Sequence, residues 1–171
     1  MSIKKAINKA VARATSRFPA ISRFVSEGRE ALETAGEIPW STPKPLCEAT
    51  VALVTTAGVH HKDQRPFDMQ DPHGDPSVRV IDVRRPLTSL MITHDYYDHR
   101  DADKDINIVF PIERLWEFQE EGALGKVAEL HYSFMGHIEE PHVKTLVEKS
   151  APWCARELAS RGVDVVVLTP G

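Results

Sequence analysis

Short runs of apolar, mostly β-branched residues alternate along this chain with segments of helical periodicity, and this alternation constrains the fold more than any other feature. Residues 49–59 (ATVALVTTAGV), 78–83 and 163–168 (VDVVVL) are typical of buried strands, and residues 87–95 and 127–136 are further strand candidates. Helical spacing runs over 113–125 and over 144–161, just before Gly162. The sequence therefore predicts an α/β fold with a mostly parallel sheet flanked by helices, in three layers as in Rossmann and flavodoxin-like proteins.

The N-terminal region differs from the rest in charge. Its first 26 residues hold no Asp or Glu, whereas apolar residues recur at helical steps. The apolar positions are Ile3, Ile7, Val11, Ala14 and Phe18, and the basic ones are Lys4, Lys5, Lys9, Arg13, Arg17 and Arg23. We predict an amphipathic helical arm that packs on its own domain or on a second copy of the chain; the alternative is a membrane-surface helix. With the proline-containing connector that follows, residues 1–45 form one region and residues 46–171 form the α/β domain.

Composition excludes several classes of protein. The net charge of −4 argues against a general nucleic-acid binder. No apolar run approaches the ~20 residues of a membrane span, so we expect none. The two cysteines, Cys47 and Cys154, form no CxxC motif, which favours a reducing, cytoplasmic setting without disulfides.

Histidines supply most of the candidate site residues. The chain has eight histidines, mostly in clusters beside strand ends. The candidates that we single out are His60, His61, His94, Asp95, His131 and His137. Three interpretations stay open: general acid–base catalysis, a structural role in capping and loop bonding, and a metal site built from His60, His94, His99 and nearby aspartates. No HExxH spacing is present.

The sequence offers no convincing nucleophile or phosphate-binding loop. It contains no GxGxxG, GxxxxGK[ST] or GxSxG motif. Cys154 lies in a predicted helix and is expected to be a small buried hydrophobe, and nothing near Cys47 would activate its thiol. The sequence therefore offers candidate acids and bases, but no candidate nucleophile to act with them.

Five stretches, in this order, resemble the selenoprotein B component of the glycine, sarcosine, betaine and D-proline reductases. They are VALVTTAGVHHKDQRPFD (51–68), HDYYDHRDADKDINIVFPIERL (94–115), EGALG (121–125), HYSFMGH (131–137) and GVDVVVLTPG (162–171). In that family a selenocysteine, encoded by UGA, follows the last of these strands. The resemblance implies that this chain ends at Gly171 because that codon was read as a stop, and that the nucleophile belongs just after Gly171.

The resemblance also implies a chemistry. The selenol would attack a substrate carbon next to an amine, a neighbouring cysteine would resolve the product, and a dithiol or thioredoxin-like donor would restore the selenol. A pyruvoyl group on a partner subunit would activate the substrate, a small amine or amino acid, and this chain itself would hold no cofactor. The candidate histidines would then donate protons to the leaving amine or contact the substrate carboxylate. Two alternatives remain: a metal-assisted hydrolase or lyase using the His/Asp clusters, and a non-catalytic assembly subunit.

Overall fold

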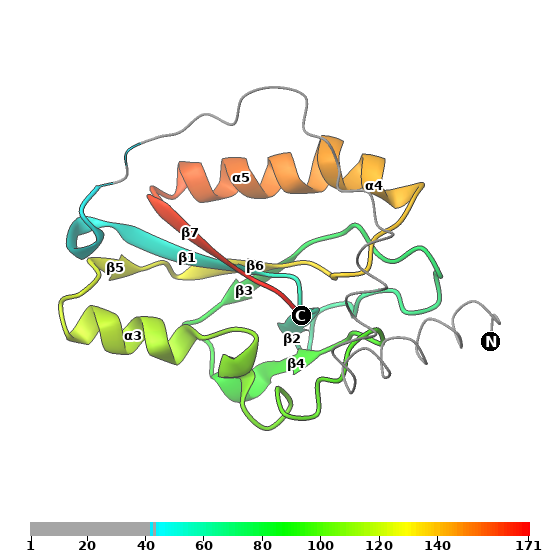
Figure 1. Cartoon of the computed structure of the whole chain (residues 1–171), viewed down its shortest axis with the longest axis horizontal. Helices are drawn as coiled ribbons and strands as arrows, with labels where there is room; N and C mark the ends of the chain where they lie inside the picture. The colour runs from blue at the N-terminus through cyan, green and yellow to red at the C-terminus, as the bar shows by residue number, and fades with distance from the viewer. Residues whose placement is uncertain (1–41, 43) are drawn as a thin grey trace, which may run out of the picture.

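The computed structural model describes residue 42 and residues 44–171. The predicted N-terminal helix and most of the proline-containing connector lie outside these residues. The described part forms an α/β fold with a mostly parallel sheet, which confirms the predicted fold class (Figure 1). Among the described residues no helix is both long and apolar enough to cross a membrane.

The main sheet has five strands: β1 (Thr50–Thr55), β3 (Arg79–Asp82), β5 (Lys126–Val127), β6 (Leu130–Ser133) and β7 (Val165–Thr169). Strand β1 pairs in parallel with β5, β6 and β7, and β3 pairs antiparallel with β6. Because β7 pairs with β1 along residues 51–55, β5 and β6 share the other side of β1. Strand β1 is thus central, and β7 is an outer strand.

Helices cover both faces of the sheet (Figure 1). Helix α3 (Ile112–Glu120) lies below it, and α4 (His142–Thr145) and α5 (Ala151–Ser160) lie above. The sequence predicted one helix over 144–161, and the structure instead has a π-helical segment, Leu146–Ser150, between α4 and α5. Pro152 explains the wider turn, since it has no N–H to donate to a carbonyl one α-helical turn earlier.

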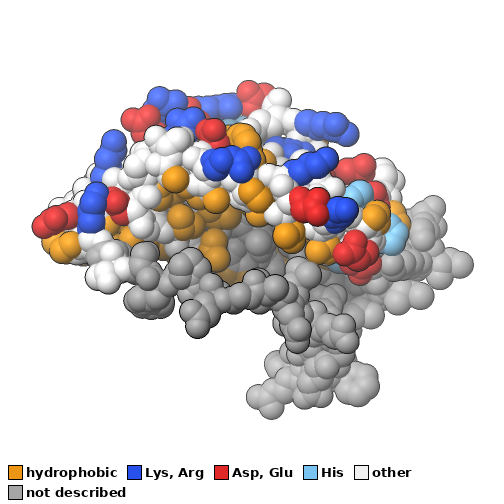
Figure 2. All heavy atoms as spheres, turned by 90° about the horizontal axis from the view of Figure 1, so that it is seen from above, with side chains coloured by type: hydrophobic (Ala, Val, Ile, Leu, Met, Phe, Trp, Pro, Cys, Tyr) orange, Lys and Arg blue, Asp and Glu red, His pale blue; other side chains and the backbone are white. Residues whose placement is uncertain are grey.

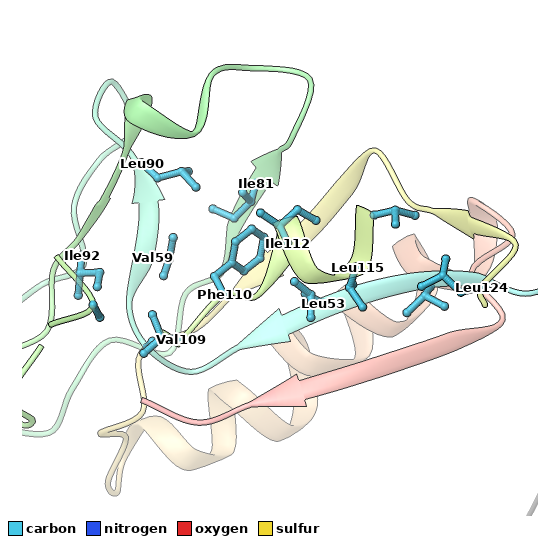
Figure 3. Close-up of a cluster of buried hydrophobic side chains, with 14 residues drawn as sticks. Leu53, Val59, Ile81, Leu90, Ile92, Val109, Phe110, Ile112, Leu115 and Leu124 are labelled. Atoms are coloured by element: carbon cyan, nitrogen blue, oxygen red, sulfur yellow. The ribbon is translucent and has the colours of Figure 1, made fainter. Parts of the chain in front are cut away.

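Each face of the sheet has its own hydrophobic cluster. On the α3 face, Leu53, Ile81 and Phe110 are fully buried with other apolar side chains (Figure 3). On the opposite face, Ala52 and Tyr132 pack with residues of α5. The alternation along β1, with Leu53 on one face and Ala52 on the other, is what a strand buried on both sides requires.

A smaller sheet lies beside the main one. The predicted strand 49–59 is wrong in extent, because β1 ends at Thr55 and the chain turns at Gly58 into β2 (Val59–His61). Strand β2 pairs antiparallel with β4 (Leu90–Ile92). Gly58 has a φ of +71°, and a Cβ there would lie 2.6 Å from the carbonyl oxygen of Thr93. A glycine is therefore required where the two sheets meet.

The remaining elements are three short 3₁₀ helices. They span Leu46–Glu48, Leu87–Ser89 and Ile106–Ile108. Asp105 caps the third of them by accepting a hydrogen bond from the amide of Asn107 at 3.0 Å. This bond agrees with the capping role that the sequence suggested for such aspartates.

The prediction that the last apolar run is a buried strand is wrong. Strand β7 forms as expected, but Val166, Val167 and Leu168 are 38%, 37% and 75% exposed. Residues 163–168 lack the alternation of apolar and polar residues that is typical of a half-buried strand. The strand nevertheless lies at the side of the sheet, and no described strand lies beyond it. Composition alone does not distinguish an outer strand of a parallel sheet from an inner one.

Seen from the side of α4 and α5, the surface carries both signs of charge. Figure 2 shows basic and acidic side chains interspersed over this face, with hydrophobic side chains between them. The described part of this face therefore shows no continuous basic patch of the kind that nucleic-acid binding requires.

Candidate functional site

Three parallel strands end at the same edge of the main sheet, where ligands bind in open α/β sheets. Strands β1, β6 and β7 end there at Thr55, Ser133 and Thr169, which are in register with one another. The segments that follow these strands meet residues 93–97, which come after β4. We call this region the edge site, and define it by Thr56, Ala57, His94, Tyr97, Gly136 and Gly171.

Two glycines allow the segments of the edge site to approach closely. A Cβ on Gly136 would lie 3.0 Å from the carbonyl oxygen of Thr56 and 3.4 Å from Nε2 of His94. A Cβ on Gly171 would lie 2.5 Å from Cα of Ala57. Gly171 therefore has no room for a side chain, and a side chain at Gly136 would require its neighbours to shift.

Threonines anchor the strand ends below this region. The hydroxyls of Thr55 and Thr169 donate to the same carbonyl, that of Val109, at 3.0 and 2.8 Å. The Thr55 hydroxyl also accepts from the amide of Ala57 at 3.2 Å. The ends of β1 and β7 are thus held to one point of the chain, which fixes where the edge site begins.

His94 is the candidate residue that the structure places in the edge site. It is 6% exposed, and its two ring nitrogens face backbone amides, Tyr96 at Nδ1 (3.1 Å) and Gly136 at Nε2 (3.2 Å). A neutral imidazole accepts at one nitrogen only, so one of these contacts is a hydrogen bond in either tautomer. A protonated ring would carry an N–H at both nitrogens, and each would face the N–H of a backbone amide, so the protonated form is disfavoured.

The electrostatics of His94 agree with this geometry. The pKa of His94 is lowered to about 4, mainly by burial and also by the nearby His137 and His99, whereas Asp95 acts in the opposite direction. The ring is therefore neutral near pH 7. A neutral imidazole is suited to accept a proton or a hydrogen bond, rather than to donate a proton to a leaving amine.

Two tyrosines, which the sequence analysis did not single out, surround His94. The Tyr97 hydroxyl donates to the carbonyl of Ala57 at 3.1 Å, and its ring packs edge-on against His94 with a centroid distance of 4.8 Å. The Tyr96 ring contacts the other side of the imidazole and stacks on His137 at 3.9 Å. Their positions between His94 and His99 were visible in the sequence, but an aromatic pair in a loop carries no signal of what it contacts.

His137 lies next to the edge site. Its Nε2 donates to the carbonyl of Pro72 at 3.2 Å, and its ring rests on Tyr96. It is thus connected to His94 through the tyrosine and belongs to the same loop cluster.

His60 and His61 lie in β2, in the smaller sheet rather than at the ends of the main-sheet strands. Nδ1 of His60 donates to the carbonyl of His61 at 2.8 Å, and its Nε2 accepts from the hydroxyl of Thr93 at 2.8 Å. Nδ1 of His61 donates to the hydroxyl oxygen of Ser89, and its Nε2 accepts from the amide of Asp82. Burial lowers the pKa of both rings. Their bonds favour a structural role, because every ring nitrogen is already used.

His131 has the same character. Its Nδ1 accepts from the amide of Leu53 and its Nε2 donates to the carbonyl of Ala128, both at 2.8 Å. Burial lowers its pKa to about 4. The ring ties β6 to β1 and has no free nitrogen for a substrate. Site roles for all six candidates stay predictions, and among the histidines His94 and His137 are the ones that lie in or beside the edge site.

The histidine and aspartate clusters do not assemble into a metal site. Residues 42 and 44–171 contain no group of three or more His, Cys, Asp or Glu side chains arranged to hold an ion. Nε2 of His60 bonds to Thr93, and Nδ1 of His99 lies 2.8 Å from a carboxylate oxygen of Asp103. The ligand set proposed for a metal-assisted hydrolase is therefore not brought together.

Neither described cysteine lies at the edge site. Cys47 is exposed in the 3₁₀ helix before β1, at the opposite end of that strand. Cys154 is buried in α5, and burial raises the pKa of its thiol to about 11. The expectation that Cys154 is a small buried hydrophobe is confirmed.

An open hollow of about 550 Å³ lies elsewhere, under the loop between β2 and β3. Arg79 closes one side of it and donates to the carbonyls of Arg65 and Pro66 at 2.7 and 3.0 Å. None of the residues that define the edge site lines this hollow. The buried guanidinium thus stabilises the loop, and the hollow is separate from His94.

Comparison with known proteins gives a consistent set of relatives. The chain is 40% identical over 128 residues to the D-proline reductase subunit gamma of Acetoanaerobium sticklandii, which covers 75% of this chain and 51% of that protein. It is 31% identical over 134 residues to the glycine reductase complex component B subunit gamma of Carboxydothermus hydrogenoformans, which covers 74% of this chain and 29% of that protein. The betaine reductase complex component B subunit beta of Peptoclostridium acidaminophilum is also 31% identical, over 137 residues, with the same two shares.

The chain thus spans about half the length of the first of these relatives and less than a third of the other two. No solved structure matches it significantly. The family described as glycine/sarcosine/betaine reductase selenoprotein B matches residues 32–171, which include all of the edge site. This match and the similarity to the reductase subunits show that the chain belongs to the glycine/sarcosine/betaine reductase selenoprotein B family.

Proposed function

We propose that this chain is a subunit of a reductase complex and contributes the edge site to the reductive cleavage of a C–N bond in a small amine or amino acid. The observation that carries the proposal is the convergence of three parallel strand ends on a buried, neutral His94, in a member of a reductase family. The named relatives are subunits of D-proline, glycine and betaine reductases, which supports this class of substrate.

The proposed reaction needs a selenol or thiol beside His94. The described cysteines lie elsewhere, and we propose that a residue outside the described ones supplies this group next to Gly171. The selenolate attacks carbon, and the C–N bond breaks with its electron pair leaving on nitrogen. A neighbouring thiolate then attacks selenium, the released carbon takes a proton, and a dithiol reduces the selenenylsulfide while becoming a disulfide. Activation of the substrate carbon is assigned to a pyruvoyl group on a partner subunit.

In this reaction His94 acts as an acceptor. Its low pKa keeps it unprotonated at neutral pH, so it orients the substrate as an uncharged hydrogen-bonding ring and does not have to move a proton. His137 and Tyr96 form the adjacent wall, and Gly136 and Gly171 allow the backbone segments of the edge site to pack closely.

The test is a dithiol-dependent assay of the protein purified anaerobically, from its own host, together with its partner subunits. Glycine, betaine, sarcosine and D-proline are supplied separately, and the C–N cleavage product, which is a free amine from the first three and the ring-opened amino acid from D-proline, is compared with dithiol oxidation. We expect equimolar cleavage product and disulfide with one of these substrates, and a loss of at least about 10²-fold in His94→Asn. His142→Asn is the matched control, since His142 is a histidine bonded to the carboxylate of Asp71 and does not act on His94, and should change the rate less than about twofold. Turnover without dithiol, or none with any of the four substrates, would overturn the proposal.

A non-catalytic assembly role is the second candidate. It is favoured by the exposed apolar side chains of Val166, Val167 and Leu168 on β7. In that case the purified complex turns over equally well with wild-type protein and with His94→Asn, whereas substitutions on β7 reduce co-purification of the partner subunits.

A further inference from the structure

Tyr97 joins the two parts of the edge site that come from different sheets. Its hydroxyl donates to the carbonyl of Ala57, just beyond the end of β1, at 3.1 Å. Its ring contacts the imidazole of His94, in the segment after β4, at a centroid distance of 4.8 Å and an interplanar angle of 69°. Ala57 is also the residue on which Gly171 lies. A single side chain thus contacts the backbone below Gly171 and the ring of His94.

We propose that Tyr97 is a positioning residue, which holds the ring of His94 in a fixed orientation toward the Ala57–Gly171 end of the edge site. The inference rests on the proposed function, because that function makes the edge site catalytic. Its test, however, measures properties of the Tyr97 and His94 side chains directly. It assigns a role to a residue that touches neither a reacting atom nor a substrate in the proposed reaction.

The hydroxyl is suited to a permanent hydrogen bond. Burial raises the pKa of Tyr97 far above its usual value, and the nearby Asp103 acts in the same direction. The phenol therefore stays protonated and remains a donor to Ala57 at every pH at which the protein works. Because the bond fixes the far end of the ring, the Tyr97 side chain cannot swing away from His94 without breaking it.

Tyr96 provides a matched comparison within the same loop. Its ring also meets the imidazole edge-on, with a centroid distance of 6.0 Å and an interplanar angle of 87°. Its hydroxyl, however, is buried without a hydrogen-bond partner among the described residues. Two adjacent tyrosines thus contact the same histidine, and only one of them is anchored through its hydroxyl.

Several titratable groups act on His94 and define what a measurement of its pKa reports. Asp95 and His99 come from its own segment, and His137 comes from the loop after β6. Neither Tyr97→Phe nor Tyr96→Phe changes any of these charges. A shift in the His94 titration then reports burial and ring orientation rather than a lost charge.

The experiment is an NMR titration of the histidine ring protons in wild-type protein, Tyr97→Phe and Tyr96→Phe. In Tyr97→Phe the ring is no longer anchored and water reaches the imidazole, so the pKa of His94 is expected to rise by at least about 0.5 unit. Tyr96→Phe should leave it within about 0.2 unit of wild type. The titration of His131, buried at a distance in β6, should be the same in all three proteins. General loosening of the fold would shift His131 as well.

An unchanged His94 titration in folded Tyr97→Phe, or equal shifts in the two tyrosine variants, would overturn the inference. If Tyr97→Phe does not fold, wild-type protein provides the second measurement. The hydroxyl proton of Tyr97 should exchange slowly enough to be observed and should show contacts to Ala57, whereas that of Tyr96 should not. A rapidly exchanging Tyr97 hydroxyl would reject the anchored ring. None of these readouts depends on enzymatic activity, so failure here and failure of the proposed function are distinguishable.

Discussion

Thr55 and Thr169 donate to the same carbonyl oxygen, that of Val109, from the ends of two adjacent parallel strands. The two bonds are not equivalent, because the Thr55 hydroxyl also accepts from the amide of Ala57. Thr55 is fully buried, whereas Thr169 is half-buried. The pair therefore fixes the floor of the edge site mainly through the central strand.

Substitution of these threonines by valine should have unequal costs. Thr55→Val removes a donor and an acceptor at a buried position and is expected to lower the free energy of unfolding by about 1–3 kcal/mol. Thr169→Val leaves Val109 bonded to Thr55 and should cost about 0.5–1.5 kcal/mol. Urea unfolding of the two variants provides the measurement. Equal costs would show that the shared carbonyl does not organise this edge.

Gly58 and Gly122 allow strain and packing to be separated. Both have positive φ, at +71° and +73°, but a Cβ on Gly58 would strike the carbonyl of Thr93, whereas nothing lies within 4 Å of one on Gly122. Gly122→Ala should therefore cost about 1 kcal/mol of conformational strain alone. Gly58→Ala should cost at least about 2 kcal/mol more, because the segment carrying His94 must shift. Thermal unfolding of the two proteins compares them directly, and a similar decrease in Tm would contradict the close approach.

Stability should fall as the solution is acidified from pH 6.5 to about pH 4. The pKa values of His94 and His131 are lowered to about 4 in the folded protein, whereas the unfolded chain has ordinary histidines near 6.5. In this window the unfolded state binds more protons than the folded state, so the free energy of unfolding rises with pH. The contribution is complete above pH 6.5 and is lost progressively toward pH 4, by roughly 3 kcal/mol per histidine.

Chemical denaturation at a series of pH values measures this slope. In His131→Gln it should decrease by about 1.4 kcal/mol per pH unit within the window, which corresponds to one proton. The same variant should also be less stable at pH 7.5, since the amide of Leu53 and the carbonyl of Ala128 lose a partner of matching geometry. An unaltered slope would mean that His131 is protonated in the folded state.

The two cysteines should differ sharply in reactivity. Cys47 is exposed, whereas Cys154 is buried and burial raises its pKa to about 11. In native protein at pH 8, one equivalent of cysteine thiol is expected to react rapidly with a disulfide reagent. The second thiol should react only after unfolding. Cys47→Ser should abolish the rapid phase and Cys154→Ser should not. Two rapid equivalents would show that α5 opens readily from the sheet.

The sequence was sufficient for the fold class because the central strand and the helices have unambiguous patterns. Strand β1 is apolar on both faces and α3 has its apolar residues at helical spacing, so both were located to within a few residues. Exposure of β7 was not predictable, since the run Val165–Thr169 would look the same in the middle of a sheet. The turn at Gly58 was also hidden, because its need for glycine arises from Thr93, which is distant in the sequence.

The candidate site shows the same division. The sequence was sufficient to select the histidines beside strand ends as candidates. It was not sufficient to tell which of them are structural and which have a ring available to a substrate. Whether a ring nitrogen is free depends on backbone groups from other strands, such as the amide of Leu53 at His131. Tyr97 was missed because its importance comes from the carbonyl that it reaches, on Ala57, and a tyrosine in a loop gives no indication of such a bond.

The central place of β1 has a consequence for the order in which the chain can fold. Its partners all come later, and Thr50 bonds to Asp164, which is 114 residues further along the chain. During synthesis β1 therefore emerges long before any strand that can pair with it, and its apolar faces stay uncovered until β5, β6 and finally β7 arrive. Contacts of such wide sequence separation make folding slow, and they leave the early segment dependent on chaperones or on prompt completion of synthesis. The strand that organises the edge site is thus synthesised first among the described strands, but is covered on both sides only when β7 has been made.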